Sequence, residues 1–223
     1  TAITSITVGG TTLTAGYSVT AGKITFTPSA SVPANLLQTS GTKTIAVIAT
    51  GYSNTSVSQT IGAGAANKLV MKTQPAAPAS NGVILSTQPA VNIQDQYGNA
   101  TTSTATVVAT VGAGTWTIGG TTSKAGVSGT ATFTNLTATS AAAVTGATIA
   151  FSSTGLTGTT SNAFNIPAPP PPAPTNDNCA GAIAITCGNS VTVDNTSATD
   201  DVLPAVSCGT NSVGYFKGTW YTV

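Results

Sequence analysis

The sequence predicts an all-β protein built from tandem β-sandwich domains that are joined by short linkers. Apolar residues alternate with polar ones at period two, and turns rich in Gly and Asn interrupt the alternation. No window places apolar residues at the i, i+3, i+4, i+7 spacing of a helix over three turns. The chain is 40% hydrophobic and only 5% charged, and its abundant Val, Ile and Thr favour strands. We therefore expect strands throughout.

Residues 1–65 are expected to form a first, small β-sandwich module. Gly9–Gly10 separates two alternating runs, which is typical of a hairpin with a primed turn. The strongest predicted strand of the unit is 42–49. About six short strands at this spacing indicate a sandwich; we place them at residues 3–8, 11–14, 17–20, 23–27, 42–49 and 57–61.

Residues 66–166 are expected to form a second sandwich after a joint of small residues. Its first strand, 69–72, should end at Thr73-Gln74-Pro75, because proline cannot donate to a sheet. About seven strands in a hundred residues make this an immunoglobulin-like sandwich by count. Besides 69–72, the clearest candidates are 90–94, 107–111, 129–133, 147–151 and 163–166.

A third unit follows the proline-rich segment 167–174, which is typical of a stiff polyproline linker. Residues 175–223 hold all three cysteines and four of the five aspartates. They are too few for an independent β domain, so we expect the start of an incomplete, disulfide-containing one. The cysteine spacings lack a metal-binding pair. Three disulfide pairings are open; we favour Cys187–Cys208, which would join two predicted strands around an aspartate loop.

The composition excludes most catalytic chemistry. The chain contains no His, Arg or Glu, so it has no Ser-His-Asp triad, no imidazole metal ligand and no guanidinium for a phosphate backbone. The first 94 residues contain no acid at all, and the second unit contains only Asp95. Neither unit can therefore host the carboxylate pair of a glycosidase. No apolar run approaches the length of a membrane span. We expect a protein that is not an enzyme.

The remaining candidate site residues have structural interpretations. Asp95 with Gly98 and Asn99 is typical of a turn in which the carboxylate accepts backbone N–H groups. Asp194, Asp200 and Asp201 form the densest acidic patch, which could hold Ca²⁺ weakly; a solvated loop is the favoured interpretation. We expect no cofactor beyond that weak Ca²⁺ alternative. Trp116 could stack on a sugar, but a core position is equally natural for it.

Several separated motifs resemble known families. Val91-Asn92-Ile93-Gln94-Asp95, Tyr97-Gly98-Asn99 and the run 129–136 occur in the order found in bacterial Ig-like adhesin repeats, over residues 68–166. Tyr17-Ser18-Val19 with Ala49-Thr50-Gly51-Tyr52 resembles a small bacterial surface module. In some proteins that module is linked to haemoglobin or haem capture, a function not carried over here because no His is present. The third unit is similar to domains of type IX-secreted cell-surface proteins of gliding bacteria.

Together these resemblances imply an extracellular, non-catalytic structural or adhesive segment of a large multi-domain cell-surface protein or filament. Because an uncharged, threonine-rich surface offers little repulsion, we expect like modules in the same fibre or chain as partners. The sequence does not identify a surface or polysaccharide receptor, and we expect no nucleic acid and no membrane span. The alternative function is an ancillary stalk or carbohydrate-binding module of a secreted hydrolase.

Overall fold

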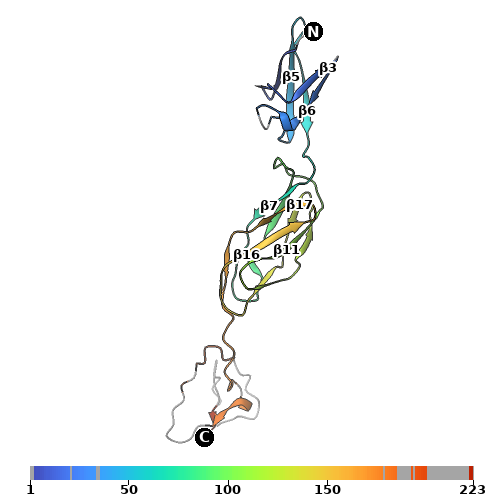
Figure 1. Ribbon diagram of the computed structural model, residues 1–223. Helices are drawn as coiled ribbons and strands as arrows, with labels where there is room; N and C mark the ends of the chain where they lie inside the picture. The colour runs from blue at the N-terminus through green and yellow to red at the C-terminus, as the bar shows by residue number, and fades with distance from the viewer. Residues whose placement is uncertain are drawn as a thin grey trace. The chain divides into compact units, whose positions relative to one another are not determined.

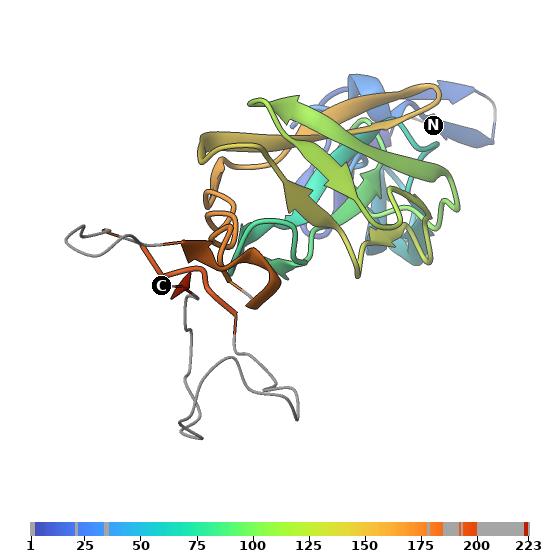
Figure 2. The same cartoon turned by 90° about the horizontal axis from the view of Figure 1, so that it is seen from below.

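The computed structural model describes residues 3–20, 22–33, 36–177, 179–184, 192, 194–199 and 221–222. Its regular elements are strands and two short 3₁₀ turns, η1 (Pro28–Ala30) and η2 (Cys179–Gly181), with no α-helix among the described residues (Figures 1 and 2). The predicted all-β class is therefore confirmed. The chain divides into two compact units, Thr1–Pro167 and Ala168–Val223.

The first sheet of the Thr1–Pro167 unit has the strand order β2-β1-β5-β6. Gly9 and Gly10 both have positive φ, +57° and +82°, as a primed hairpin turn between the first two strands requires. A separate hairpin, β3-β4, belongs to the same module. The strands are β1 (Ile3–Val8), β2 (Thr11–Thr12), β3 (Tyr17–Thr20), β4 (Lys23–Phe26), β5 (Gly41–Ala49) and β6 (Thr55–Ile61). We call residues 3–61 the first module.

A small cluster of aliphatic side chains forms the core of the first module. Alternation along β1 buries Ile6 and Val8 on one face, and β5 contributes Ile45. Two loop residues, Leu13 and Leu37, complete the buried cluster. The aromatic residues of the hairpin, Tyr17 and Phe26, are only partly buried against it. Little apolar surface is therefore removed from water in this module.

Residues 66–167, which we call the second module, build a larger sheet with the order β13-β11-β16-β17-β7-β10-β14, and β18 also pairs with β16. Two small two-stranded sheets, β8-β9 and β12-β15, complete the module. The strands are β7 (Lys68–Thr73), β8 (Ala76–Pro78), β9 (Leu85–Thr87), β10 (Ala90–Gln94), β11 (Thr106–Ala113), β12 (Thr117–Gly119), β13 (Ser123–Ala125), β14 (Thr130–Thr132), β15 (Thr137–Thr139), β16 (Val144–Ser153), β17 (Leu156–Thr160) and β18 (Phe164–Ile166).

The core of the second module contains aromatic as well as aliphatic side chains. Phe133 and Phe151 are almost fully buried, and their ring centroids are 5.5 Å apart. Trp116 meets Phe164 edge to face at 5.7 Å. Such ring pairs add stabilisation beyond the area they bury. Long alternating strands such as β16, which buries Ala147, Ile149 and Phe151, surround these rings with apolar neighbours.

In the Ala168–Val223 unit, the described strands are β19 (Ile183–Ala184) and β20 (Tyr221–Thr222), which pair in parallel. Asp177 Oδ1 accepts the N–H of Thr199 at 2.7 Å, and its Oδ2 accepts the Thr199 hydroxyl at 2.7 Å. Cys187 and Cys208, the favoured disulfide pair, lie outside the described residues, as do Asp200 and Asp201. The division into four segments proposed from the sequence, 1–65, 66–166, 167–174 and 175–223, stays a prediction.

Candidate functional site

Asp95 is the buried acid of the second module, and its carboxylate organises the turn after β10. Only 1% of the residue is exposed. Its Oδ1 accepts the backbone N–H groups of Tyr97 at 2.9 Å and of Asn99 at 2.8 Å. Gly98 has φ +90°, which favours glycine at this point of the turn. The structure thus places Asp95, Gly98 and Asn99, the three turn residues named from the sequence, in one local unit.

The second carboxylate oxygen of Asp95 reaches beyond that turn. Oδ2 accepts the N–H of Gly64, from the joint that precedes the second module, at 2.8 Å. It also accepts the side-chain amide of Asn99 at 2.8 Å. Burial by itself raises the pKa of Asp95, but the four N–H groups from Asn99, Gly64 and Tyr97 outweigh it and lower the pKa below its ordinary value. Asp95 is therefore held as an anion by donors from two segments.

Asn99 extends the same network to the first module. Its Nδ2 donates to the carbonyl oxygen of Gln38 at 2.7 Å as well as to Asp95, and its Oδ1 accepts the N–H of Ser40 at 2.9 Å. The side-chain amide therefore uses both of its donor hydrogens and its acceptor oxygen. The network contains no nucleophile and no second acid. Its chemistry is that of a structural connection.

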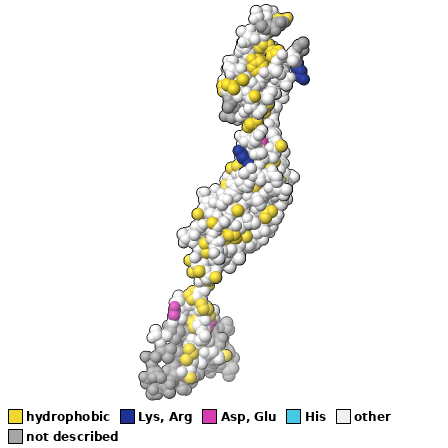
Figure 3. Space-filling view, viewed as in Figure 1, with side chains coloured by type: hydrophobic (Ala, Val, Ile, Leu, Met, Phe, Trp, Pro, Cys, Tyr) yellow, Lys and Arg dark blue, Asp and Glu magenta, His cyan; other side chains and the backbone are white. Residues whose placement is uncertain are grey.

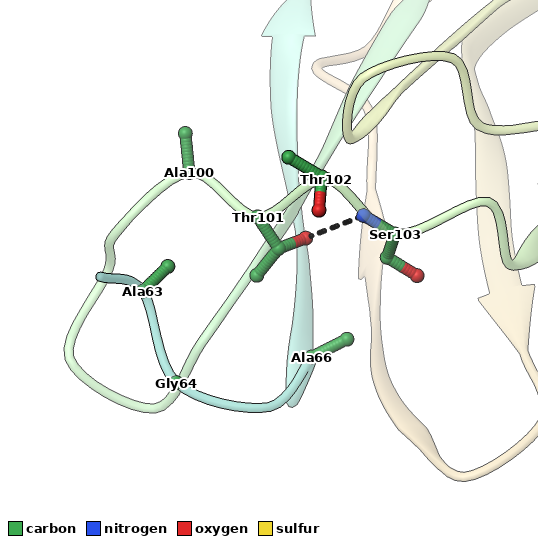
Figure 4. Close-up of a pocket in the computed structure, with 7 residues that line it drawn as sticks. All are labelled: Ala63, Gly64, Ala66, Ala100, Thr101, Thr102 and Ser103. Carbon is green, nitrogen blue, oxygen red and sulfur yellow. Dashed lines mark hydrogen bonds between the residues drawn. The ribbon is translucent and has the colours of Figure 1, made fainter.

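A cavity of about 390 Å³ lies beside this network (Figure 4). The Thr101 hydroxyl donates to the carbonyl of Ile93 at 2.7 Å and accepts the N–H of Ser103 at 3.3 Å. The walls carry only methyl groups, hydroxyls and backbone, from Ala63, Gly64, Ala66 and residues 100–103. Such a lining can neither move a proton at neutral pH nor ligate a metal strongly.

The acidic residues of the Ala168–Val223 unit also serve local structure where they are described. Asp194 Oδ1 accepts both the N–H of Thr196, at 2.9 Å, and its hydroxyl. The Thr196 hydroxyl and then its backbone N–H lower the pKa of Asp194. Among the described residues, no group of three or more His, Cys, Asp or Glu side chains is gathered as metal ligands would be. The weak Ca²⁺ alternative stays a prediction.

The aromatic residues divide clearly between core and surface. Trp116 is 7% exposed, and its indole N–H donates to the carbonyl of Ala113 at 2.8 Å. Its ring is therefore not available for stacking on a sugar. Tyr52, in the loop between β5 and β6, is 67% exposed. This loop thus presents a large amphipathic side chain to solvent.

Exposed apolar side chains of the first module are the feature that the sequence did not reveal. Val19, Val32 and Val57 are each about half exposed, at 50%, 49% and 57%. Val19 and Val57 lie in alternating strand sequences like those of buried valines, so only the tertiary structure identifies them as exposed. Charged side chains, in contrast, form isolated spots on the visible face of the molecule (Figure 3).

Comparison with known proteins gives one family match. Residues 1–62, about a quarter of the chain, match the family model described as "Heme-binding protein Shr-like, Hb-interacting domain". No curated protein matches the chain. The segment whose motifs resemble a small bacterial surface module therefore coincides with the residues that match this domain. No helix among the described residues has the length and apolarity needed to cross a membrane.

Several solved structures are distantly similar. A beta-glycosidase from Bacteroides vulgatus has 12% identity and a TM-score of 0.37 over 74% of this chain and 21% of that chain. Domains 4 and 5 of the S-layer protein SbsC have 17% identity and a TM-score of 0.31 over 74% of this chain and 70% of that chain. This chain thus spans about a fifth of the glycosidase. With such low scores, these structures say nothing about its activity.

Proposed function

We propose that this chain is a non-catalytic, extracellular segment of a bacterial surface protein, in which the first module binds a protein ligand and the following modules extend it. The match of residues 1–62 to a haemoglobin-interacting domain carries the proposal. The composition supports it, because the chain lacks His, Arg and Glu, and because Asp95 is fully engaged in structural hydrogen bonds. We also propose, more specifically, that the surface protein is adhesive, is exported by the type IX route and is linked to gliding motility.

Haemoglobin is the first ligand to test, and direct contact with the globin is the proposed mode of binding. The matched segment contains no His, Met or Cys that could ligate haem iron. Its two phenols are poorly placed for that purpose: Tyr17 packs against the core of its own module, and Tyr52 is 67% exposed to water. The residues of this segment therefore do not fit haem as a resident group. This segment must therefore recognise haemoglobin through contacts with the surface of the globin.

Tyr52 is the proposed anchor of that surface. Exposed tyrosines in loops supply large contact areas at low entropic cost and are frequent hot spots of protein interfaces. Ile48, near the end of β5, is 36% exposed. In the same region, the hydroxyls of Thr4 and Thr50 lie 3.3 Å apart. These residues offer the mixed apolar and hydroxyl character typical of an interface without charged groups.

The experiment is biolayer interferometry of the 223-residue chain against immobilised haemoglobin, with free haem measured separately by its absorbance spectrum. We expect saturable binding to haemoglobin and no specific spectral shift of haem. Tyr52→Ala should weaken the binding about tenfold or more, whereas Tyr52→Phe should retain most of it. Val127→Ala, at a residue 76% exposed in the second module, is the matched control and should bind as the wild type does. Absence of haemoglobin binding would refute this choice of ligand.

A further inference from the structure

The edge of the first module's sheet is unusually long and open. β6 ends the sheet, with β5 on one side only. Residues 55–60 are all exposed, and the register with β5 runs without a bulge from Gly41 opposite Ile61 to Val47 opposite Thr55. The other strands that end a sheet in the described part of the chain are two to four residues long. β6, with seven residues, is the regular edge on which another strand could pair.

The sequence of β6 lacks the residues that normally protect an edge strand from pairing with another chain. Its sequence, Thr-Ser-Val-Ser-Gln-Thr-Ile, contains no charge, no proline and no glycine. The neighbouring cation, Lys43 on β5, lies opposite Gln59. Lys43 Nζ donates to the Thr39 hydroxyl at 2.9 Å, so the ammonium group is bound to its own module. No like-charge repulsion therefore opposes the approach of an identical strand.

We propose that β6 pairs antiparallel with β6 of a second copy of this chain, about a two-fold axis at Val57. This register places Val57 opposite its own equivalent, Ser56 opposite Ser58, and Thr55 opposite Gln59. Because Ile45 lies opposite Val57 within each module, the pairing creates one apolar row, Ile45–Val57–Val57–Ile45, on a single face of the joined sheet. The 57% exposed side chain of Val57 is covered by it.

A second copy is the occupant favoured by the strand itself. Every pair in this register is apolar with apolar or hydroxyl with an uncharged polar group, so a neutral strand meets its neutral equivalent. Haemoglobin cannot occupy the edge in this way, because the globin fold consists of helices and supplies no strand. The inference rests on the proposed function as a cell-surface protein and on the expectation from the sequence that like modules associate. It names the strand through which they associate.

The expected strength of this contact is low for isolated molecules. In this register only five of the seven residues of β6, Thr55 to Gln59, lie opposite β6 of the partner copy, so the contact buries less area than the roughly 800 Å² per partner of a stable interface. Tethering many chains to one surface raises their effective concentration and converts such weak contacts into stable ones. Measurements in solution therefore need concentrated protein or a covalent trap.

The first test is cysteine cross-linking in the full 223-residue chain. Directly opposed residues have Cα atoms about 4.5–5.5 Å apart, within disulfide range, so Val57→Cys should give a disulfide-linked dimer under mild oxidation. Ser58→Cys is the matched control: two Ser58 positions lie diagonally, about 7–8 Å apart, and should cross-link at least about tenfold more slowly. Mass spectrometry of the linked peptides distinguishes a 57–57 link from links between native cysteines. Equal rates for the two variants, or no 57–57 link, would overturn the proposal.

The second test introduces a charge at position 57 in place of a cross-linking cysteine. Val57→Lys puts two ammonium groups opposite each other on the two-fold axis and should abolish the concentration-dependent dimer in sedimentation velocity. Ser18→Lys, on the exposed hairpin strand β3 of the same module, adds the same charge away from β6 and should leave the dimer intact. Haemoglobin binding by Val57→Lys should stay at the wild-type level, so the ligand proposal stands or fails separately. A wild-type chain that remains monomeric when concentrated overturns the pairing.

Discussion

The two sandwich modules of the Thr1–Pro167 unit differ in how they use the same strand-forming composition. In the described residues, the first module buries five apolar side chains in one cluster, whereas the second buries sixteen. The second owes its core to four aromatic rings and ends its sheets in strands of three residues. The first leaves Tyr17 and Phe26 only partly buried and Tyr52 exposed, and its sheet ends in the open strand β6. Threonine-rich strands can thus form a closed core or a pairing edge, and the number of buried aromatic residues distinguishes the two outcomes.

The largest effect should come from the core of the second module. Phe151→Ala removes a ring that is 1% exposed and paired with Phe133. We expect a loss of about 3–5 kcal/mol in the free energy of unfolding of that module. Calorimetry should show its transition at a lower temperature and leave the transition of the first module in place. Movement of both transitions together would show that the two cores fold as one.

A matched change in the first module sharpens the contrast. Phe26 is partly exposed against a smaller cluster, so Phe26→Ala removes fewer contacts. We expect the free energy of unfolding to fall by about 1–3 kcal/mol, because the partly exposed Phe26 ring buries less apolar area in the core than the Phe151 ring does. Chemical denaturation followed by hydrogen exchange on the β1 and β5 amides is the measurement. A cost as large as that of Phe151→Ala would mean that the small core is more tightly packed than its exposure indicates.

Asp95→Asn tests the connection between the modules. The substitution keeps the size of the side chain but replaces one acceptor oxygen by an NH₂ that faces N–H donors, so we expect a cost of about 2–3 kcal/mol. Since the folded-state pKa is lowered, the stabilisation is present above the unfolded pKa of about 4 and is lost as the pH falls through the folded pKa. Urea titrations between neutral and acidic pH should show this loss in the wild type and not in the variant. Asp194→Asn, at an exposed acid, is the control and should change stability far less.

Asn99→Ala removes the side chain that bridges Asp95 to residues 38 and 40. We expect a smaller loss, about 1–2 kcal/mol, because backbone donors to Asp95 remain. Exchange of the Ser40 amide, which donates to Asn99 Oδ1, should accelerate by about fivefold or more. Unchanged exchange at Ser40 would contradict the bridge.

The smallest effect is expected on the exposed face of β5 and β6. The hydroxyls of Thr42 and Thr60 lie 3.3 Å apart on this solvated surface. Thr60→Val should change stability by less than about 0.5 kcal/mol. Thermal denaturation provides the measurement, and a change above about 1 kcal/mol would show that this hydroxyl contact is cooperative with the sheet.

The sequence predicted several of the longer strands well, because period-two alternation is visible only over several residues. It located only the middle of the longest strand, β16, and missed β17. The strands at 3–8, 41–49 and 90–94 were found within a residue of their bounds. Three-residue strands such as β8, β13 and β15 were missed, since so short a segment shows no periodicity. Trp116, for which the sequence leaves a sugar-stacking and a core position open, lies just before β12 and is buried in the core.

The site was predictable only in its local part. The order Asp95, Gly98, Asn99 carries the chemistry of a turn, which sequence alone indicates. The N–H of Gly64 and the contacts of Asn99 with Gln38 and Ser40 come from segments 31 to 61 positions away, and no local pattern encodes them. The exposure of Val57 was equally hidden, because a valine at period two is normally a core residue.

The saturation of Asp95 by amide protons has a practical consequence for a protein outside the cell. Extracellular modules that bind Ca²⁺ do so weakly, so their sites respond to the ion content of the medium. Here the two carboxylate oxygens of Asp95 already accept four N–H groups, from Gly64, Tyr97 and Asn99. This connection should therefore persist in a chelator-treated or calcium-poor environment and should weaken only in acid.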